Sequence, residues 1–411
     1  MRLTYLVACS PSLSSFPSDR RSFSPRKPRF FPRAEMSLVS QDGHPPLAEK
    51  IVVLGCGALS ADYLATVDAF PKPDDKIRST SLKIEGGGNT GNALTCAARL
   101  GLKPRLISKI ANDFQGKNIL TELEGDGVDT SFIVVSEGNS PFTYIIVDNE
   151  TKTRTCIHTP GYPPMMPNDL SNSKLCSALD DSSLVYLDGR LHETALAVAQ
   201  EATQRKIPIL VDAERKREGL DDLLNLATYV VCSEKFPQAW TSGPSIPNAL
   251  AAMLLSLPNI KFVIVTRGYK GCIMLERSID DTCEAEEMEI GSLLESLMQK
   301  ADWGSIIPTC ISSKMNIRIR ADEIGSFSGR LLVGTAEVIP PSELIDTTGA
   351  GDAFIGAILY ALCVGMAEKM LPFASLVAAA GCRALGARSG LPWRTDPRLA
   401  PFLRDSSESL S

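Results

Sequence analysis

Short apolar runs alternate with longer amphipathic stretches from residue 51 onward. Continuous apolar runs of this length are typical of strands buried on both faces of a parallel sheet. The stretches between them, such as residues 193–206 and 248–257, have the length of helices that connect parallel strands. The pattern predicts an open, mostly parallel α/β sheet with helices on both faces. Its predicted strands are residues 51–55, 185–189, 207–213, 229–233 and 262–268.

A second pattern interrupts this alternation. Residues 142–160 contain two strand-like segments joined by the polar turn NETKT, and residues 79–88 predict a further strand. We expect segments at about 76–90 and 140–160 to form a small separate β-sheet. Its place in the sequence suggests a lid that closes over a substrate.

Residues 278–329 separate two apolar segments that we expect to pair as a hairpin, 271–277 and 329–338. Loops beyond about 15 residues are uncommon in compact domains. We therefore predict a surface insertion, helical at residues 292–301, and assign no chemistry to it.

The first 34 residues are rich in Ser, Pro, Phe and Arg, and Asp19 is their only acid. This composition is typical of a transit peptide and favours the chloroplast. The alternatives are a disordered leader and a cytoplasmic protein that starts at Met36. We assign residues 1–48 to the leader, 49–398 to the folded domain and 399–411 to a C-terminal tail.

Charge and cysteine usage exclude several classes of function. The net charge of −6 argues against a nucleic-acid-binding surface, and the longest apolar run, 353–367, is shorter than the roughly 20 residues of a membrane span. We therefore expect no nucleic-acid or membrane partner. The cysteines lie singly in apolar runs without a CxxC pair, so a disulfide framework or zinc site is not expected. Examples are Cys56, Cys96, Cys232, Cys272 and Cys382.

The stretch DTTGAGDAF, residues 346–354, carries candidate chemistry. We expect a helix to begin at about Gly349, where unpaired backbone N–H groups and the helix dipole attract anions. Glycine at 349 and 351, with Ala350 between them, lets a phosphate approach the backbone. Asp352 would then act as a general base that takes a proton from an attacking hydroxyl. The alternative is an acid that only complements the dipole.

A second cluster, GGGNTGNALTCAARLG, occupies residues 86–101. The side-chain amides of Asn89 and Asn92 can bond sugar hydroxyls, and the preceding glycines let a ring come close. The sequence contains no GxxxxGK[ST] motif, which disfavours a P-loop kinase.

Together the two clusters resemble the signatures of the pfkB (ribokinase-like) family of carbohydrate kinases, over roughly residues 51–398 apart from the insertion. The resemblance implies a Rossmann-like, ribokinase-like body with a β-sheet lid, and ATP with Mg²⁺ as cofactors. It matches Asp352 to the catalytic base and Gly349, Ala350 and Gly351 to the anion hole. The family sometimes shows monovalent-cation activation near the segment matching DTTG, so K⁺ is a further candidate.

The resemblance also implies sugar-binding positions. Asp62 matches the family's sugar-binding aspartate, the alternative being an exposed loop acid. Arg154 would reach in from the lid, unless it is a solvated strand residue. Asp188 and Arg190 lie at the end of a predicted strand, where open α/β sheets bind ligands. Other substrate positions, in or near stretches more similar to ketohexokinases than to ribokinases, are Asp74, Gly88, Asn89 and Asn92.

For the nucleotide, VTRGYKGCIML resembles the family's turn near the ATP phosphates, with Thr266, Gly268 and Gly271 matching and Arg267 and Lys270 adding positive charge. The segment AAAGCRALGA resembles the stretch that flanks adenine. Its candidate residues are Ala380 and Gly386.

The chain departs from the family at the NxxE motif that orients Mg²⁺ through water. Ser233 and Phe236 occupy the two motif positions, and Glu234 is the candidate substitute.

We therefore expect ATP-dependent phosphorylation of a sugar hydroxyl, on a ketose, fructose-like or ribose-like substrate, with a homodimer formed through the lid. Two alternatives stay open. A nucleoside kinase would use lid aromatics such as Tyr144 and Tyr162 to stack the base. A catalytically weak, structural or regulatory protein would resemble the plastid fructokinase-like proteins.

Overall fold

A computed structural model describes residues 51–151, 153–278 and 287–403. The chain divides into two units, residues 1–41 and 42–411, and the described residues all belong to the second. The leader predicted for residues 1–48, and with it the transit peptide, lies outside the described residues.

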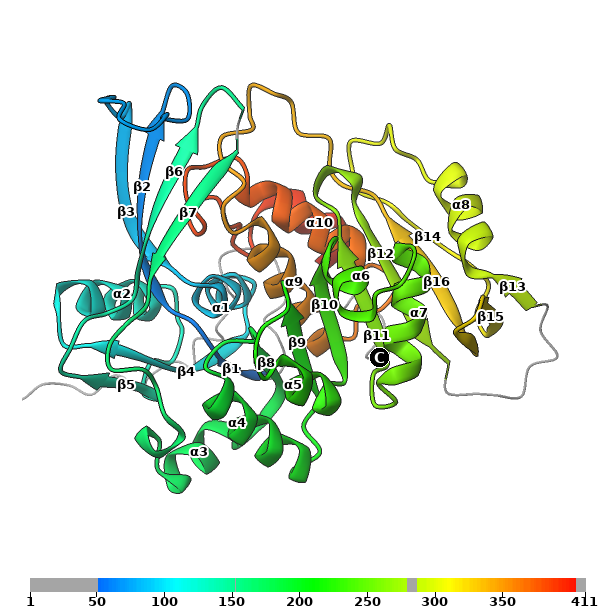
Figure 1. The fold of residues 1–411 in the computed structure, drawn as a ribbon, viewed down its shortest axis with the longest axis horizontal. Coiled ribbons are helices and arrows are strands. Elements are labelled where there is room, and N and C mark those ends of the chain that lie inside the picture. The colour runs from blue at the N-terminus through cyan, green and yellow to red at the C-terminus, as the bar shows by residue number, and fades with distance from the viewer. Residues whose placement is uncertain (1–50, 152, 279–286, 404–411) are drawn as a thin grey trace, which may run out of the picture. The chain divides into compact units, whose positions relative to one another are not determined.

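The larger of two sheets has twelve strands in the described part of the chain. Its central parallel part follows the order β11-β10-β9-β8-β1-β4-β5 (Figure 1). The five predicted runs form β1, β8, β9, β10 and β11. The bounds are β1 Val52–Cys56, β4 Lys103–Ala111, β5 Ile133–Ser136, β8 Ser182–Leu187, β9 Ile209–Ala213, β10 Tyr229–Ser233 and β11 Phe262–Thr266.

The large sheet continues beyond β11 in antiparallel strands. β12 (Cys272–Arg277) pairs with β11 and with β16 (Gly325–Gly334), which gives the expected hairpin. Described residues of the segment between these two strands add further strands to the sheet, which the sequence pattern did not indicate. β14 (Cys310–Ser312) and β15 (Ile317–Ala321) pair with β16, and β13 (Glu287–Glu289) pairs with β15. Helix α8 (Ile290–Lys300) covers the predicted helical stretch.

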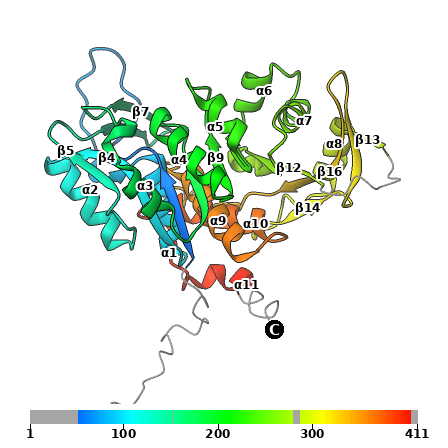
Figure 2. The ribbon, with the colours of Figure 1, turned by 90° about the horizontal axis from the view of Figure 1, so that it is seen from below.

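Helices cover both faces of this sheet (Figure 2). One face packs against α1 Asn89–Arg99, α2 Phe114–Gly125, α9 Ala350–Val364, α10 Met370–Gly381 and α11 Ala400–Leu403. The other packs against α3 Asn172–Leu179, α4 His192–Gln204, α5 Leu220–Leu226, α6 Phe236–Thr241, α7 Ile246–Ser256 and α8. Short 3₁₀ turns are Pro167–Asp169, Gly268–Lys270 and Pro397–Leu399.

Helix α9 is apolar on nearly all sides because it is buried between α1 and α10. A Cβ at Gly356 would lie 2.5 Å from the Cβ of Cys96 on α1, so this glycine permits the close approach of the two helices. Among the described helices, none has both the length and the hydropathy to cross a membrane.

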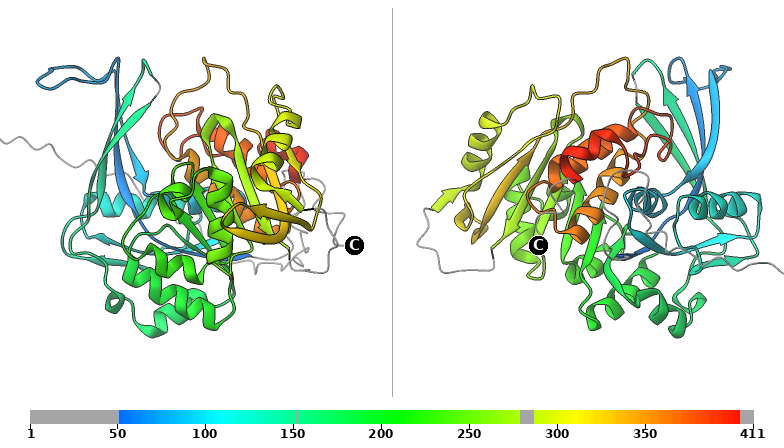
Figure 3. Two further views of the ribbon diagram at one scale, coloured as in Figure 1. Left: turned by 45° about the vertical axis from the view of Figure 1, so that its right-hand side comes forward. Right: turned by 180° about the vertical axis from the view of Figure 1, so that it is seen from behind.

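The smaller sheet has four described strands: β2 (Ser60–Val67), β3 (Ser81–Gly87), β6 (Phe142–Asp148) and β7 (Arg154–Thr159). Their order is β3-β2-β6-β7, and they rise beside α1 and α2 (Figures 1 and 3). Both predicted lid segments supply strands. The central strand β2 was not predicted.

The packed body extends past residue 398, where the tail was predicted to begin. Leu399, Phe402 and Leu403 are buried, and the Phe402 ring lies 5.9 Å from the ring of Phe373 on α10. These apolar contacts hold the chain end against the body.

Candidate active site

The loop before α9 is fixed by a buried carboxylate. Asp346 accepts hydrogen bonds from the backbone and hydroxyl of Thr348, at 2.9 and 2.8 Å, and from the backbone N–H of Gly386 at 2.9 Å. Gly349 then adopts a φ of 73° and caps the helix, with space for its missing Cβ filled by Ala387. These contacts therefore fix the orientation of the first backbone amides of α9.

The Gly351 position differs from Gly349. A Cβ there would meet no protein atom within 4 Å, so its backbone faces open space. First-turn amides have no acceptor within the helix. The Ala350 amide makes one long turn bond, 3.3 Å to the Thr347 carbonyl. Amides without helical acceptors beside open space are the features that the predicted anion site requires.

Asp352 lies in this first turn and is held by Asn92. The Asn92 Nδ2 donates to Asp352 Oδ2 at 2.8 Å. The close packing of α1 on α9 places the two side chains together, although they are 260 residues apart in sequence. Burial raises the pKa of Asp352 to about 7; the Asn92 bond opposes this rise, and the negative charge of Glu214 adds to it. A carboxyl with this pKa exchanges protons readily near neutral pH.

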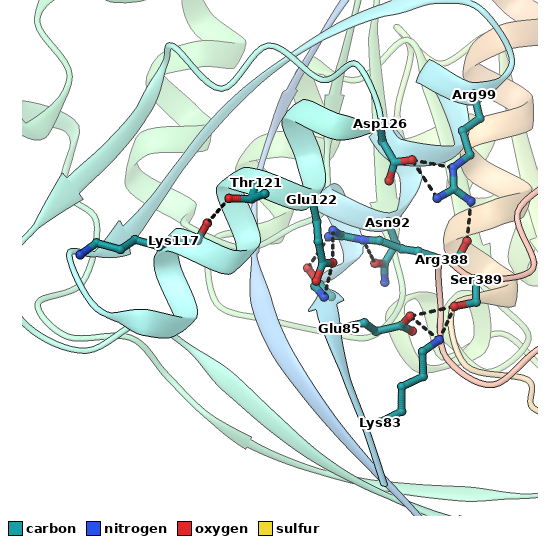
Figure 4. A network of polar contacts seen from close by, with 12 residues as sticks. Lys83, Glu85, Asn92, Arg99, Lys117, Thr121, Glu122, Asp126, Arg388 and Ser389 are labelled. Carbon is teal, nitrogen blue, oxygen red and sulfur yellow. Dashed lines mark hydrogen bonds and ion pairs between the residues drawn. The ribbon is translucent and has the colours of Figure 1, made fainter. Parts of the chain in front are cut away.

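Arg388 holds the oxygen of the Asn92 side-chain amide, whose nitrogen bonds Asp352 (Figure 4). Its Nε donates to Asn92 Oδ1 at 3.0 Å, and its NH2 group donates to the Gly87 carbonyl at 3.0 Å. Arg388 is 3% exposed, and its NH1 group lies 3.7 Å from Glu122. This arginine fixes which way the Asn92 amide points, and so which group faces Asp352. The sequence analysis did not single it out.

The glycine triplet at 86–88 makes room for protein groups. A Cβ at Gly87 would lie 2.0 Å from the Asp62 carboxylate, and one at Gly86 would lie 2.4 Å from Arg388. A Cβ at Gly88, whose φ is 87°, would lie 2.5 Å from the Ala58 carbonyl. A side chain at any of these three positions would therefore collide with the fold, so the packing of Asp62, Arg388 and Ala58 itself requires glycine here.

The lid supplies two of the predicted substrate residues. Asp62 lies on β2 and is buried, not on an exposed loop. Burial raises its pKa to about 6, against hydrogen bonding by Ser60 and the charge of Arg388. Arg154, on β7, donates to the Thr347 hydroxyl at 2.9 Å, beside the start of α9. Asp74 lies apart from them on the exposed loop between β2 and β3.

Further carboxylates gather where β8 and β9 end. Asp188 accepts from the backbone N–H groups of Ala58 (2.7 Å) and Arg190 (3.0 Å). Asp212 is buried and hydrogen-bonded by Asn89; burial, followed by the charges of Asp352, Glu214 and Asp188, raises its pKa. Asn89 and Asp188, two residues named from the sequence, thus lie near Asp352 together with Asp212, which was not named.

Arginines surround Glu214, the residue after β9. Its Oε2 lies 2.8 Å from Arg217, 3.3 Å from Arg190 and 3.8 Å from Arg215. Glu214 therefore holds three guanidinium groups together near the end of β9. Only Arg190 had been noted from the sequence, because the run ERKR has the composition of an ordinary solvated loop.

The family assignment follows from a comparison of the whole chain. The model for pfkB family carbohydrate kinases matches residues 48–289 and 328–394. The chain belongs to this family. The family is one of kinases, and the unmatched residues between the two segments contain α8, β14 and β15.

Related proteins extend this result. The chain is 24% identical to mouse ribokinase over 378 residues, covering 89% of this chain and all of that one. It is 22% identical to mouse ketohexokinase over 354 residues, covering 84% of this chain and 97% of that one. The solved structure of Arabidopsis thaliana ribokinase complexed with ribose and ATP superposes with a TM-score of 0.61 at 19% identity, covering 87% and 99%. The fold is ribokinase-like, and these identities do not favour the ketohexokinase-type resemblance over the ribokinase one.

In this pfkB protein a cavity of about 820 Å³ opens beside the α9 N-terminus. Thr266, Gly268 and Gly271 line it together with Ala350 and Gly351, so residues predicted for nucleotide binding and for the anion hole border one cavity. Arg154 lines it from the lid side.

The residues predicted beside adenine require a correction. Ala380 is buried on the other side of α10 and does not line the cavity. Gly386 is used to hold Asp346, as described above. The cavity is lined instead by Ala378, Ala379 and Cys382. Cys382 follows Ala378 by four residues and Ala379 by three, so the three side chains lie on one side of the helix, away from Ala380.

Glu234, the candidate substitute in the NxxE position, is engaged by two cations. Its Oε1 lies 3.2 Å from Arg267 Nε and 3.8 Å from Lys270 Nζ. Among the residues that the structure describes, no cluster of three or more His, Cys, Asp or Glu side chains has the geometry of a metal site.

Proposed function

We propose that the protein transfers the γ-phosphoryl group of ATP to a hydroxyl of a ketose or ribose-like sugar. The observation that carries this proposal is Asp352, a carboxyl with a pKa raised to about 7 in the first turn of α9. A base and an anion site on the same helical turn suit proton removal from a hydroxyl that attacks a phosphoryl group.

Each part of the site has a role in this transfer. Asp352 takes the hydroxyl proton, and Asn92, held by Arg388, keeps its carboxylate in position. The amides after Gly349 stabilise charge on the phosphoryl oxygens in transit. Arg154 of the lid lies beside the same point, and closure of the lid excludes water, which limits hydrolysis of ATP.

The residues present fit ATP, and Mg²⁺ would be held mainly by the phosphates. The cavity size is in the range of nucleotide-sized pockets, and its α9 end offers amides to the phosphates. Magnesium commonly uses few protein ligands together with substrate phosphates, where it neutralises their charge. A Glu234 paired with Arg267 and Lys270 is compatible only with an indirect contribution.

The test is ADP release by the full-length protein against ketoses, aldoses and nucleosides with ATP and Mg²⁺. We expect release that depends on a sugar, with a fructose- or ribose-like compound giving the highest kcat/KM. The panel is repeated with K⁺ replaced by Na⁺ to test cation activation. Release with nucleosides alone would favour the nucleoside kinase, and no acceptor-dependent release would favour a structural or regulatory role.

We also propose that the protein dimerises through the outer face of the lid. This face carries the exposed apolar side chains of Leu82, Ile84, Tyr144 and Ile157. Strand pairing aligns the last three across the sheet, with Tyr63 between Ile84 and Tyr144. An exposed apolar row of this kind favours association.

For this interface we expect Tyr144→Lys to raise the dimer dissociation constant at least about 10-fold, since a central aromatic is replaced by a charge. Sedimentation equilibrium measures the constant. Ile306→Lys, at an exposed isoleucine outside the lid, is the matched control and should leave it unchanged. A monomeric wild-type protein at micromolar concentration would contradict the proposal.

A further inference from the structure

A tryptophan from the insertion lines the same cavity as the anion site. Trp303 follows α8 and lies within residues 290–327, which the family model does not match. It nevertheless borders the cavity that contains Thr266 and Gly351. Trp303 lies outside the matched part of the family model, so the insertion contributes a lining residue to the cavity that the model does not include.

The indole of Trp303 is held in place. Its Nε1 donates to the Met298 carbonyl at 2.8 Å, which satisfies the polar edge of the ring. Helix α8, which carries Met298, is anchored by Leu293, Leu294 and Leu297 in the core under the sheet. Trp303 remains 39% exposed. A large aromatic with a satisfied N–H and an open part of its surface at a cavity is suited to contact a ligand.

The cavity has two chemically different parts. Near α9 it offers the backbone of Ala350 and Gly351, which suits phosphate. Most of the remaining lining residues are apolar, Trp303 among them, with Glu337 and Ser375 among the polar exceptions. The apolar lining includes Val338, Ile339, Leu344, Ala378 and Ala379. A nucleoside triphosphate has the same division, an anionic chain and a flat, weakly polar base.

We propose that Trp303 contacts the nucleobase of the phosphoryl donor, so that the insertion between β12 and β16 determines nucleotide affinity and preference. This inference rests on the proposed function for the identity of the ligand. The phosphates bind at the α9 amides, and the base lies among the apolar residues against the indole. Figure 1 shows α8 on the side of the body away from the lid, so the insertion acts on the donor and leaves the sugar side to the lid.

The experiment is calorimetric binding of a non-hydrolysable ATP analogue to the full-length protein. We expect Trp303→Ala to raise the dissociation constant about 10-fold or more, because stacking on an aromatic contributes a large share of base affinity. Trp303→Phe should recover most of it, and binding of inorganic tripolyphosphate, which has no base, should be unchanged. Ile306→Ala, in the same segment but outside the cavity lining, is the matched control.

A dissociation constant within about twofold of wild type for Trp303→Ala would overturn the inference, as would an equal loss of tripolyphosphate binding. A Trp303-dependent affinity without any acceptor-dependent ADP release would support the base contact while contradicting the proposed kinase reaction. Absence of analogue binding to the wild-type protein at millimolar concentration would contradict both.

Discussion

Turnover of the Asp352→Asn variant is expected to fall at least about 10²-fold, with the ATP-analogue dissociation constant near that of wild type. The amide keeps the shape of the side chain and can still contact Asn92, but it cannot accept the hydroxyl proton. Steady-state ADP release measures the loss, and thermal unfolding checks that the variant is folded. Turnover within threefold of wild type would contradict the assignment of Asp352 as the base.

The pH profile gives a second test of the same residue. A base must be deprotonated to act, and the pKa of Asp352 is raised to about 7. We therefore expect kcat/KM to fall as pH drops below about 7 and to level off above it. Asn92→Ala removes the hydrogen bond that lowers this pKa, so the fall should move to higher pH. An unchanged profile in Asn92→Ala would show that another group titrates.

Arg388→Met is expected to lower the free energy of unfolding by about 3 kcal/mol. Removing one partner of a buried ion pair leaves uncompensated charge, at a cost of about 3–5 kcal/mol, and the partial exposure of Glu122 places the effect at the lower end. Asp62 and Glu85 also lose a nearby positive charge. Urea unfolding at pH 7 measures the change.

The control for this variant is Arg398→Met. Arg398 forms an ion pair with Asp396 at 2.7 Å, but the arginine side chain is 43% exposed, against 4% for Arg388, so its loss should change stability by less than about 1 kcal/mol. Equal effects of the two substitutions would contradict the structural role of Arg388. Because Arg388 also orients Asn92, its variant should lose turnover in addition to stability.

Local pattern was sufficient for much of the fold. Apolar runs of five to seven residues identified five strands of the large sheet, since strands buried on both faces need apolar side chains at every position. The lid strand β2 was missed because its alternation is weak: Asp62 and Thr66 face the same side as the buried Leu64. A charged residue at a buried position broke the apolar pattern by which this strand would have been recognised.

The insertion shows a different limit of pattern. Its helix was predicted from residues 292–301, because apolar spacing depends only on nearby residues. Its strands β13, β14 and β15 are short, and they are strands because β16 and β15 offer them hydrogen-bonding edges. The sequence of a short strand does not indicate which strand edge of the sheet it will pair with. The sequence therefore could not place Trp303 at the cavity.

By itself, the sequence determined the residue types and turns on which the chemistry depends: a helix start with Gly349 and Gly351, and an acid at Asp352, are properties of one contiguous stretch. Only the tertiary structure decided what surrounds that acid. Asn92 reaches Asp352 through the packing of α1 on α9, and Arg388 holds Asn92 from a loop that is distant in sequence. The raised pKa arises from that burial and from neighbouring charges, which depend on distances in space and not along the chain.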